Sequence, residues 1–357
     1  MESADSEKEM VVVSESSHQE TQSSTRTTFT KIFGDFLALA ARAISDAKTS
    51  KNITGNLKEF NLTDLERATN NFEEVLGRGL SGNVSIGWVH EKTYAPTTPY
   101  TGLPIAVRRF FPEHEQGHIE WQMEIDLSRE CSHPSLVKLL GYCSEGQERL
   151  LVYEYMQNRG FDTQFCRRFS WQDRLKLLIG VARCLEFFHT AKQIVIFRDL
   201  KTSHILLDEN FVAKLSLHGL ARLTQSNRDT DVTTHSAATR CYAAPEYVNS
   251  GVISLETDVY VFGVVFLEVM TGLRADEMLH FTDSITYHND KDNCLVYIAT
   301  SLEPHLDPGL EDSYPGGARR QLFPFIASFL TKCLDSSPGQ RPSMSQVVES
   351  LERIPNA

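Results

Sequence analysis

The chain has 357 residues, of which 41% are hydrophobic and 23% are charged, an ordinary composition for a globular protein of one or two domains. A formal net charge of −12 argues against nucleic acid or an anionic lipid surface as the main partner. The seven cysteines are odd in number and never spaced as Cys-x-x-Cys, which favours a reduced intracellular compartment over a disulfide framework or a zinc site.

Two segments precede the globular part of the sequence. Residues 1–28 are rich in Ser, Thr and Glu without an aromatic residue, so we predict a disordered head. Residues 29–59 predict a helix and linker, in which the apolar stretch 29–47 either docks on the protein's own surface or contacts a partner or membrane. Because residue 2 is Glu2 and not glycine, we expect no N-myristoylation, and no apolar run approaches the roughly 20 residues of a membrane span.

A glycine-rich stretch, VLGRGLSGNVSIG, opens the globular part. It places Gly77, Gly79 and Gly82 in the pattern G-x-G-x-x-G, followed by Val84. Glycines let a hairpin backbone approach phosphates that a Cβ would hold away. Taken alone, the pattern also fits an ordinary glycine-rich turn.

Three segments then follow that predict a strand, a helix and a second strand. PIAVRRF predicts a strand in which Ala106 leads to Arg108, at the position of the lysine in V-A-I-K. HIEWQMEIDLSREC predicts a helix with Glu124 where the partner glutamate of that lysine would stand. RLLVYEYMQN predicts a buried strand that runs into a hinge at Glu154 and Met156.

A long helix is predicted to begin the second half. Ser170, with Asp173 three residues later, matches a capping box. Apolar residues follow at spacings of four and three, which predicts one buried helical face: Trp171, Leu175, Leu178, Ala182 and Leu185.

Further motifs come next, in a fixed order. The first is VIFRDLKTSHILLD, which contains Asp199 and Lys201, and AKLSLHG follows it. Three later motifs each contain one residue of interest: Glu246 in YAAPEY, Asp258 in TDVYVFG and Arg341 in GQRPSM. Together the motifs resemble those of eukaryotic protein kinases over about residues 60–355. This resemblance implies an α+β, two-lobed kinase fold, with a β-rich lobe over about residues 60–156 and a helical lobe over about residues 157–355.

The amino-acid sequences of several segments are similar to those of one plant family. FNLTDLERATNNF, HPSLVKLLGYC and LLVYEYM resemble the receptor-like cytoplasmic kinases, specifically their subfamily VII. The resemblance implies a Ser/Thr kinase scaffold that acts with receptor-like kinases or other signalling proteins in immunity or development. It also implies a cytoplasmic location, with the plasma membrane reached through protein partners.

The resemblance assigns roles to single residues, and it implies that both residues that would hold magnesium are altered. Asp199 and Lys201 are retained as the catalytic base and its neighbour. His204 stands where an asparagine would hold one magnesium ion, and Leu217 replaces the aspartate that holds both. Because magnesium requires oxygen ligands, we expect no magnesium site. We therefore predict a pseudokinase that acts as a scaffold or decoy; the alternative is a Ser/Thr kinase with low or atypical phosphotransfer.

The expected adenine slot is intact. It comprises Val84, Ala106 and Leu206 around the hinge, and it does not depend on magnesium. Arg108 keeps the positive charge but not the point contact of a lysine. We expect weak ATP binding or none. The alternative is that these residues only pack the seam between the lobes.

Two further expectations concern folding and regulation. The resemblance implies a buried ion pair between Glu246 and Arg341, and a bond from Asp258 to the backbone of the catalytic loop. It also implies phosphorylation in the segment before YAAPEY, on these residues: Thr233, Thr234 and Thr239. The basic partner for such a phosphate would be Arg198. The alternative is an ordinary polar loop.

Overall fold

The computed structural model describes residues 57–79, 81–113, 115–164, 169–191, 194–197, 199–217, 241–281, 291–310 and 319–354. They belong to one compact unit, Asn56–Ala357. The predicted head, residues 1–28, and nearly all of the predicted helix and linker, residues 29–59, lie outside the described residues. Among the helices described, none is long and apolar enough to cross a bilayer.

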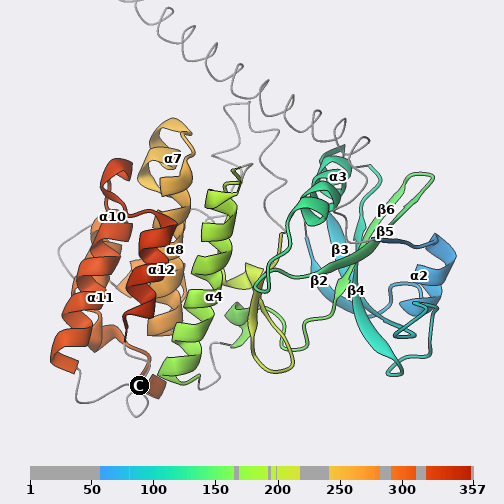
Figure 1. The fold of residues 1–357 in the computed structure, drawn as a ribbon, viewed down its shortest axis with the longest axis horizontal. Coiled ribbons are helices and arrows are strands. Elements are labelled where there is room, and N and C mark those ends of the chain that lie inside the picture. The colour runs from blue at the N-terminus through green and yellow to red at the C-terminus, as the bar shows by residue number, and fades with distance from the viewer. Residues whose placement is uncertain are drawn as a thin grey trace, which may run out of the picture. The chain divides into compact units, whose positions relative to one another are not determined.

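The N-terminal lobe is built on a six-stranded sheet (Figure 1) with the strand order β1-β5-β6-β4-β3-β2. The strands are β1 (Lys58–Glu59), β2 (Val75–Arg78), β3 (Gly82–Val89), β4 (Leu103–Phe110), β5 (Leu139–Glu145) and β6 (Glu148–Glu154). Neighbouring strands pair antiparallel, except that β1 runs parallel to β5. Because β1 lies within the segment predicted as linker, the folded lobe begins before residue 60.

The side chains of β4 show how this sheet is covered on two faces. Ile105 and Val107 are fully buried in a cluster with residues of helix α2 (Leu62–Ala68). The intervening Ala106 packs on a second cluster, which includes residues of helix α3 (Glu115–Glu130). Since side chains alternate along a strand, Arg108 falls on the α3 face, the face that carries the candidate site.

The C-terminal lobe is helical, with a small two-stranded sheet. Its helices are α4 (Trp171–Thr190), α7 (Pro245–Ser250), α8 (Leu255–Thr271), α9 (Ala275–Phe281), α10 (Lys291–Thr300), α11 (Arg319–Cys333) and α12 (Met344–Glu352). The strands are β7 (Ile205–Leu207) and β8 (Ala213–Leu215). Single turns of 3-10 helix occur at Phe161–Gln164 (η1), Thr202–His204 (η2), Glu303–His305 (η4), Pro308–Leu310 (η5) and Pro338–Gln340 (η6). A β-sheet lobe followed by a helical lobe confirms the predicted α+β, two-lobed fold.

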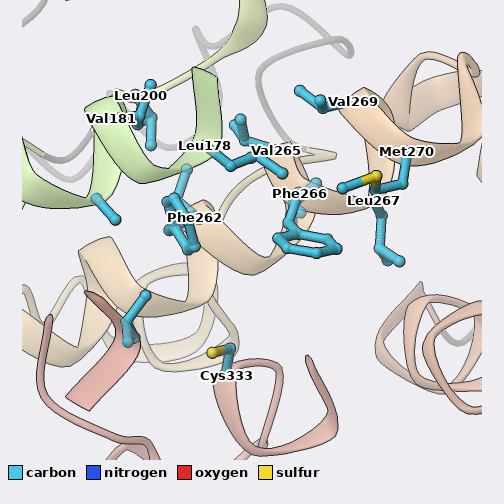
Figure 2. Packing of buried hydrophobic residues seen from close by; sticks show 14 of the residues in the cluster. Leu178, Val181, Leu200, Phe262, Val265, Phe266, Leu267, Val269, Met270 and Cys333 are labelled. Atoms are coloured by element: carbon cyan, nitrogen blue, oxygen red, sulfur yellow. The ribbon is translucent and has the colours of Figure 1, made fainter. Parts of the chain in front are cut away.

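Helix α8 forms the centre of the helical lobe. Every residue from Thr257 to Thr271 is buried, and most of these residues are apolar, as expected for a helix at the centre of a core. Figure 2 shows Leu178 of α4 beside Val265 of α8, in the same hydrophobic cluster. On the α11 side a Cβ at Gly263 would lie only 3.2 Å from the Cβ of Cys333, so a glycine allows the two helices to approach.

Helix α4 begins where the sequence predicts. Ser170 is the N-cap, and its hydroxyl oxygen accepts a hydrogen bond from the Asp173 amide at 3.2 Å. The Ser170 hydroxyl itself donates to the Asp173 carboxylate at 2.7 Å, which differs from the predicted capping box, in which that carboxylate would accept from the N-cap amide. The predicted apolar face is confirmed as buried: Trp171, Leu175, Leu178, Ala182 and Leu185.

The predicted ion pair between Glu246 and Arg341 is confirmed. Both terminal nitrogens of Arg341 donate to the Glu246 carboxylate, at 2.7 and 2.8 Å. Burial alone would raise the pKa of Glu246, but the hydrogen bonds from Arg341 hold it below its ordinary value. The pair therefore stays ionised and ties α7 to the turn before α12.

Candidate functional site

The catalytic-loop residues retained in the sequence lie together in the structure. The Nζ of Lys201 is 3.6 Å from the Oδ2 of Asp199, and both side chains are partly exposed. Below them, Asp258 is fully buried and accepts a hydrogen bond from the Phe197 amide at 2.7 Å. Asp258 also pairs with the Nε2 of His189 at 2.8 Å. The predicted bond from Asp258 to the loop backbone is therefore confirmed.

His204 is turned toward the protein backbone. Its Nδ1 lies 2.7 Å from the carbonyl oxygen of Asp199, so this nitrogen is the donor, and its own carbonyl accepts from the Ser216 amide at 2.9 Å. These contacts close the catalytic loop onto the segment after β8. They use the imidazole as a structural donor within the loop.

Leu217 is part of the hydrophobic core. Its exposed fraction is 2%, and it belongs to the large cluster of the helical lobe. A magnesium site of the kind that kinases use requires an oxygen ligand at this position and another at His204. A buried leucine and a backbone-bound imidazole do not fit that ion.

Arg108 is the centre of a buried polar network. Its Nη1 donates to Glu124 at 2.6 Å, and its Nη2 donates to Glu120 at 2.7 Å and to the Ser81 hydroxyl at 2.9 Å. Ser81 donates in turn to Glu120 at 2.6 Å, and the hydroxyl of Tyr153 donates to Glu124. All five residues are buried. The sequence predicted a pairing with Glu124, and the structure places Arg108 between two carboxylates.

Burial and neighbouring charges act in opposite directions on the pKa values of this network. Burial alone would lower the pKa of Arg108, but Glu124 and its neighbours raise it above its ordinary value. Burial raises the pKa of Glu124, partly offset by Arg108. Burial and the adjacent carboxylate raise the pKa of Tyr153 well above its ordinary value, so the phenol keeps its proton and remains a donor.

The residues of the expected adenine slot are brought together in part. Met156 is buried in the cluster beneath α3, and the partly buried Ala106 and Leu206 pack against that cluster. The carboxylate of Glu154 pairs with Lys214 of β8 at 2.7 Å and accepts from the Lys138 amide at 2.8 Å. Glu154 therefore links the hinge to the helical lobe through its side chain.

The three glycines of the glycine-rich loop have different surroundings. A Cβ at Gly82 would collide with the carbonyl oxygen of Arg109, so strand packing alone requires a glycine there. A Cβ at Gly77 would meet no atom within 4 Å. The amide of Gly79 donates to the carbonyl of Gly82 at 2.8 Å and closes the hairpin. Val84 lies in β3 directly opposite Arg108.

Sequence reasoning missed Ser81, Glu120 and Tyr153. One signal was available for Glu120, because it precedes Glu124 by four residues and therefore lies on the same helical face. No local pattern indicates the direction in which Ser81 points. Arg198 and the threonines predicted as phosphorylation sites lie outside the described residues: Thr233, Thr234 and Thr239.

Comparison with known proteins agrees with the fold and the retained motifs. Residues 70–351 match the family model described as protein tyrosine and serine/threonine kinase. The chain is 40% identical over 309 residues to the probable serine/threonine-protein kinase PBL11 of Arabidopsis thaliana, covering 84% of this chain and 78% of that protein. It is also 40% identical over 309 residues to receptor-like cytoplasmic kinase 176 of Oryza sativa subsp. japonica, covering 84% and 76%. The chain belongs to the protein kinase family.

Proposed function

We propose that this protein is a pseudokinase of receptor-like cytoplasmic kinase subfamily VII, a kinase-fold scaffold or decoy whose ATP-dependent phosphoryl transfer is impaired. The observation that supports this most is the burial of Leu217, 2% exposed, at the position of the metal-binding aspartate. Phosphoryl transfer depends on metal ions that neutralise the phosphates. Without oxygen ligands at Leu217 and His204, the charge of a bound triphosphate is poorly compensated.

The residues that hold the fold support the same proposal. The ion pair of Arg341 and the buried carboxylate of Asp258 are intact, although the ligands for magnesium are replaced. A chain that keeps its folding residues and not its metal ligands is suited to act through its surface. Its partners would be receptor-like kinases or other signalling proteins, met in the cytoplasm or at the plasma membrane.

The proposal predicts that magnesium will not stabilise the protein in the presence of ATP. The melting temperature with millimolar MgATP should lie within about 1 °C of that with ATP plus chelator, because the metal gains no ligands in the cleft. A ligand at about 100 times its Kd would add about 2.7 kcal/mol, which corresponds to a shift of several degrees. A magnesium-dependent rise of that size would defeat the proposal.

The second candidate function is a Ser/Thr kinase with low or atypical activity. It is favoured by the names of the relatives, which are serine/threonine-protein kinases, and by the retained pair of Asp199 and Lys201. The pseudokinase and the active kinase differ in whether the native chain transfers phosphate in a manner that depends on Asp199, and this difference can be measured.

We further propose that an active partner kinase phosphorylates Thr233 or Thr234 and thereby switches the binding surface of this protein. A phosphothreonine adds about −1.5 to −2 charges and can form one to three charge-assisted hydrogen bonds. After incubation with a candidate receptor kinase, mass spectrometry should find phosphate on these threonines. Thr233→Ala/Thr234→Ala should lose the change in partner affinity, whereas Thr224→Ala in the same segment should keep it. Unmodified threonines, or equal affinities for the double variant and the phosphorylated native protein, would exclude the switch.

A further inference from the structure

The network around Arg108 occupies the place where a kinase contacts the phosphates of its nucleotide. In kinases the glycine-rich loop covers those phosphates, and the β-strand lysine reaches them from below. Here Ser81, which lies between Gly79 and Gly82 of that loop, donates to Glu120 and accepts from Arg108. Hydrogen bonds between protein side chains thus join the glycine-rich loop, strand β4 and helix α3 without a nucleotide.

Three hydrogen bonds from Arg108 lie within this network. Its Nη2 is shared between Glu120 and Ser81, its Nη1 is taken by Glu124, and its guanidinium carbon lies 4.3 Å from the centre of the Phe110 ring. The residue is 6% exposed. A phosphate that took the place of Glu124 or Glu120 on the guanidinium would have to displace a buried carboxylate that is already hydrogen-bonded at 2.6 or 2.7 Å.

The charge of the network opposes a second anion. Both oxygens of Glu124 accept hydrogen bonds, from Arg108 and from Tyr153, which is the arrangement of an ionised carboxylate. Glu120 accepts from two donors on a single oxygen. One guanidinium with two carboxylates leaves a net charge of −1 in a buried site, where repulsion of a phosphate is weakly screened.

We propose that the Glu120 carboxylate stands in for the nucleotide phosphates, so that it braces the N-terminal lobe without a ligand and makes the cleft reject phosphates. This inference rests on the proposed function, since it specifies why the cleft does not use ATP. The expected ligand preference is the opposite of a kinase's: an uncharged adenine compound such as adenosine binds at least as well as ATP.

The test replaces the charge of Glu120 while keeping its shape. In chelator, Glu120→Gln should bind ATP about fivefold or more tightly than the native protein, because a negative charge leaves the buried network. It should also melt at a lower temperature without nucleotide, since Arg108 loses one of its two ion-pair partners and the hydrogen bond from Ser81 becomes a neutral one. Glu148→Gln is the matched control. Glu148 pairs with Arg109, the residue next to Arg108 in β4, and the side chains of Glu148 and Arg109 are 19% and 40% exposed. This control should leave ATP affinity unchanged.

Two further affinities test the inference: that of Glu120→Asp for ATP and that of the native protein for adenosine. Glu120→Asp retains the charge, so its affinity for ATP should stay within about twofold of native. The native protein in chelator should bind adenosine at least as tightly as ATP. Equal ATP affinities for native protein and Glu120→Gln, including no detectable binding by either, would overturn the inference. If Glu120→Gln does not fold, the native protein decides the question: an affinity for ATP about tenfold higher than its affinity for adenosine would overturn the inference.

These binding assays are independent of catalysis. They contain no magnesium and involve no phosphate transfer. If the native chain transfers phosphate, the proposed function fails while Glu120→Gln still reports on the network. If Glu120→Gln has no effect and the native chain is inert, only the role of Glu120 is wrong.

Discussion

Replacing Arg341 by alanine should lower the free energy of unfolding by about 3–5 kcal/mol, since it leaves the partly buried carboxylate of Glu246 without its partner. The guanidinium also donates to the backbone carbonyls of Asp335 at 2.8 Å and Glu256 at 2.9 Å, and lies 4.9 Å from the centre of the Tyr260 ring. Its side chain is fully buried. One substitution therefore breaks the contacts that join α7, α8 and the turn before α12. Chemical denaturation followed by circular dichroism measures the loss.

The control for this variant is another arginine–glutamate pair in the same lobe. Arg353 contacts Glu349 at a helix surface, with both side chains more than 60% exposed. Exposed pairs contribute about 0–1 kcal/mol, so Arg353→Ala should have little effect. Similar losses for the two variants would show that the buried pair does not hold the lobe together.

The sequence predicted the elements that depend on local pattern and on motif order. The buried face of α4 followed from apolar spacing, and the pair of Glu246 with Arg341 followed from the resemblance to kinases. Both predictions are confirmed because the spacing of apolar residues and the identity of a motif can be read from one sequence without an alignment. The start of the N-terminal lobe was placed too late, since the two residues of β1 pair with β5 and carry no strand pattern of their own.

The Arg108 network could be predicted only in part. Arg108 and Glu124 were expected to pair because each stands in a motif. The involvement of Glu120 and Ser81 depends on the reach of a guanidinium, and on the distances between helix α3, strand β4 and the glycine-rich loop. Those distances are set by tertiary packing. The burial of Leu217 is similar: the sequence shows that a ligand is missing, and only the fold shows that the position belongs to the core.

The second large effect is expected from restoring the altered positions together. Arg108→Lys, His204→Asn and Leu217→Asp return a compact cation and two oxygen ligands to the cleft, and Asp199 is already present as base. We expect magnesium-dependent phosphate incorporation about tenfold or more above that of the native chain, which corresponds to about 1.4 kcal/mol of transition-state stabilisation. Adding Asp199→Ala to the triple variant should remove the gain.

The triple variant should also be less stable than the native protein. Lysine cannot bridge Glu120, Glu124 and Ser81 as Arg108 does, and an aspartate at position 217 enters an apolar environment. Activity must therefore be compared at a temperature at which circular dichroism shows every variant to be folded. A folded triple variant that stays inert would mean that the defect extends beyond these three positions.

The most direct test of impaired catalysis is phosphate transfer by the native chain, measured with labelled ATP and magnesium beside Asp199→Ala. The side chain of Asp199 lies 3.6 Å from that of Lys201 and both are partly exposed, so replacing Asp199 should leave the fold unchanged. We predict that the native protein and Asp199→Ala incorporate the same background amount of phosphate. Magnesium-dependent incorporation by the native chain that disappears in Asp199→Ala would contradict this prediction and identify the protein as an active kinase.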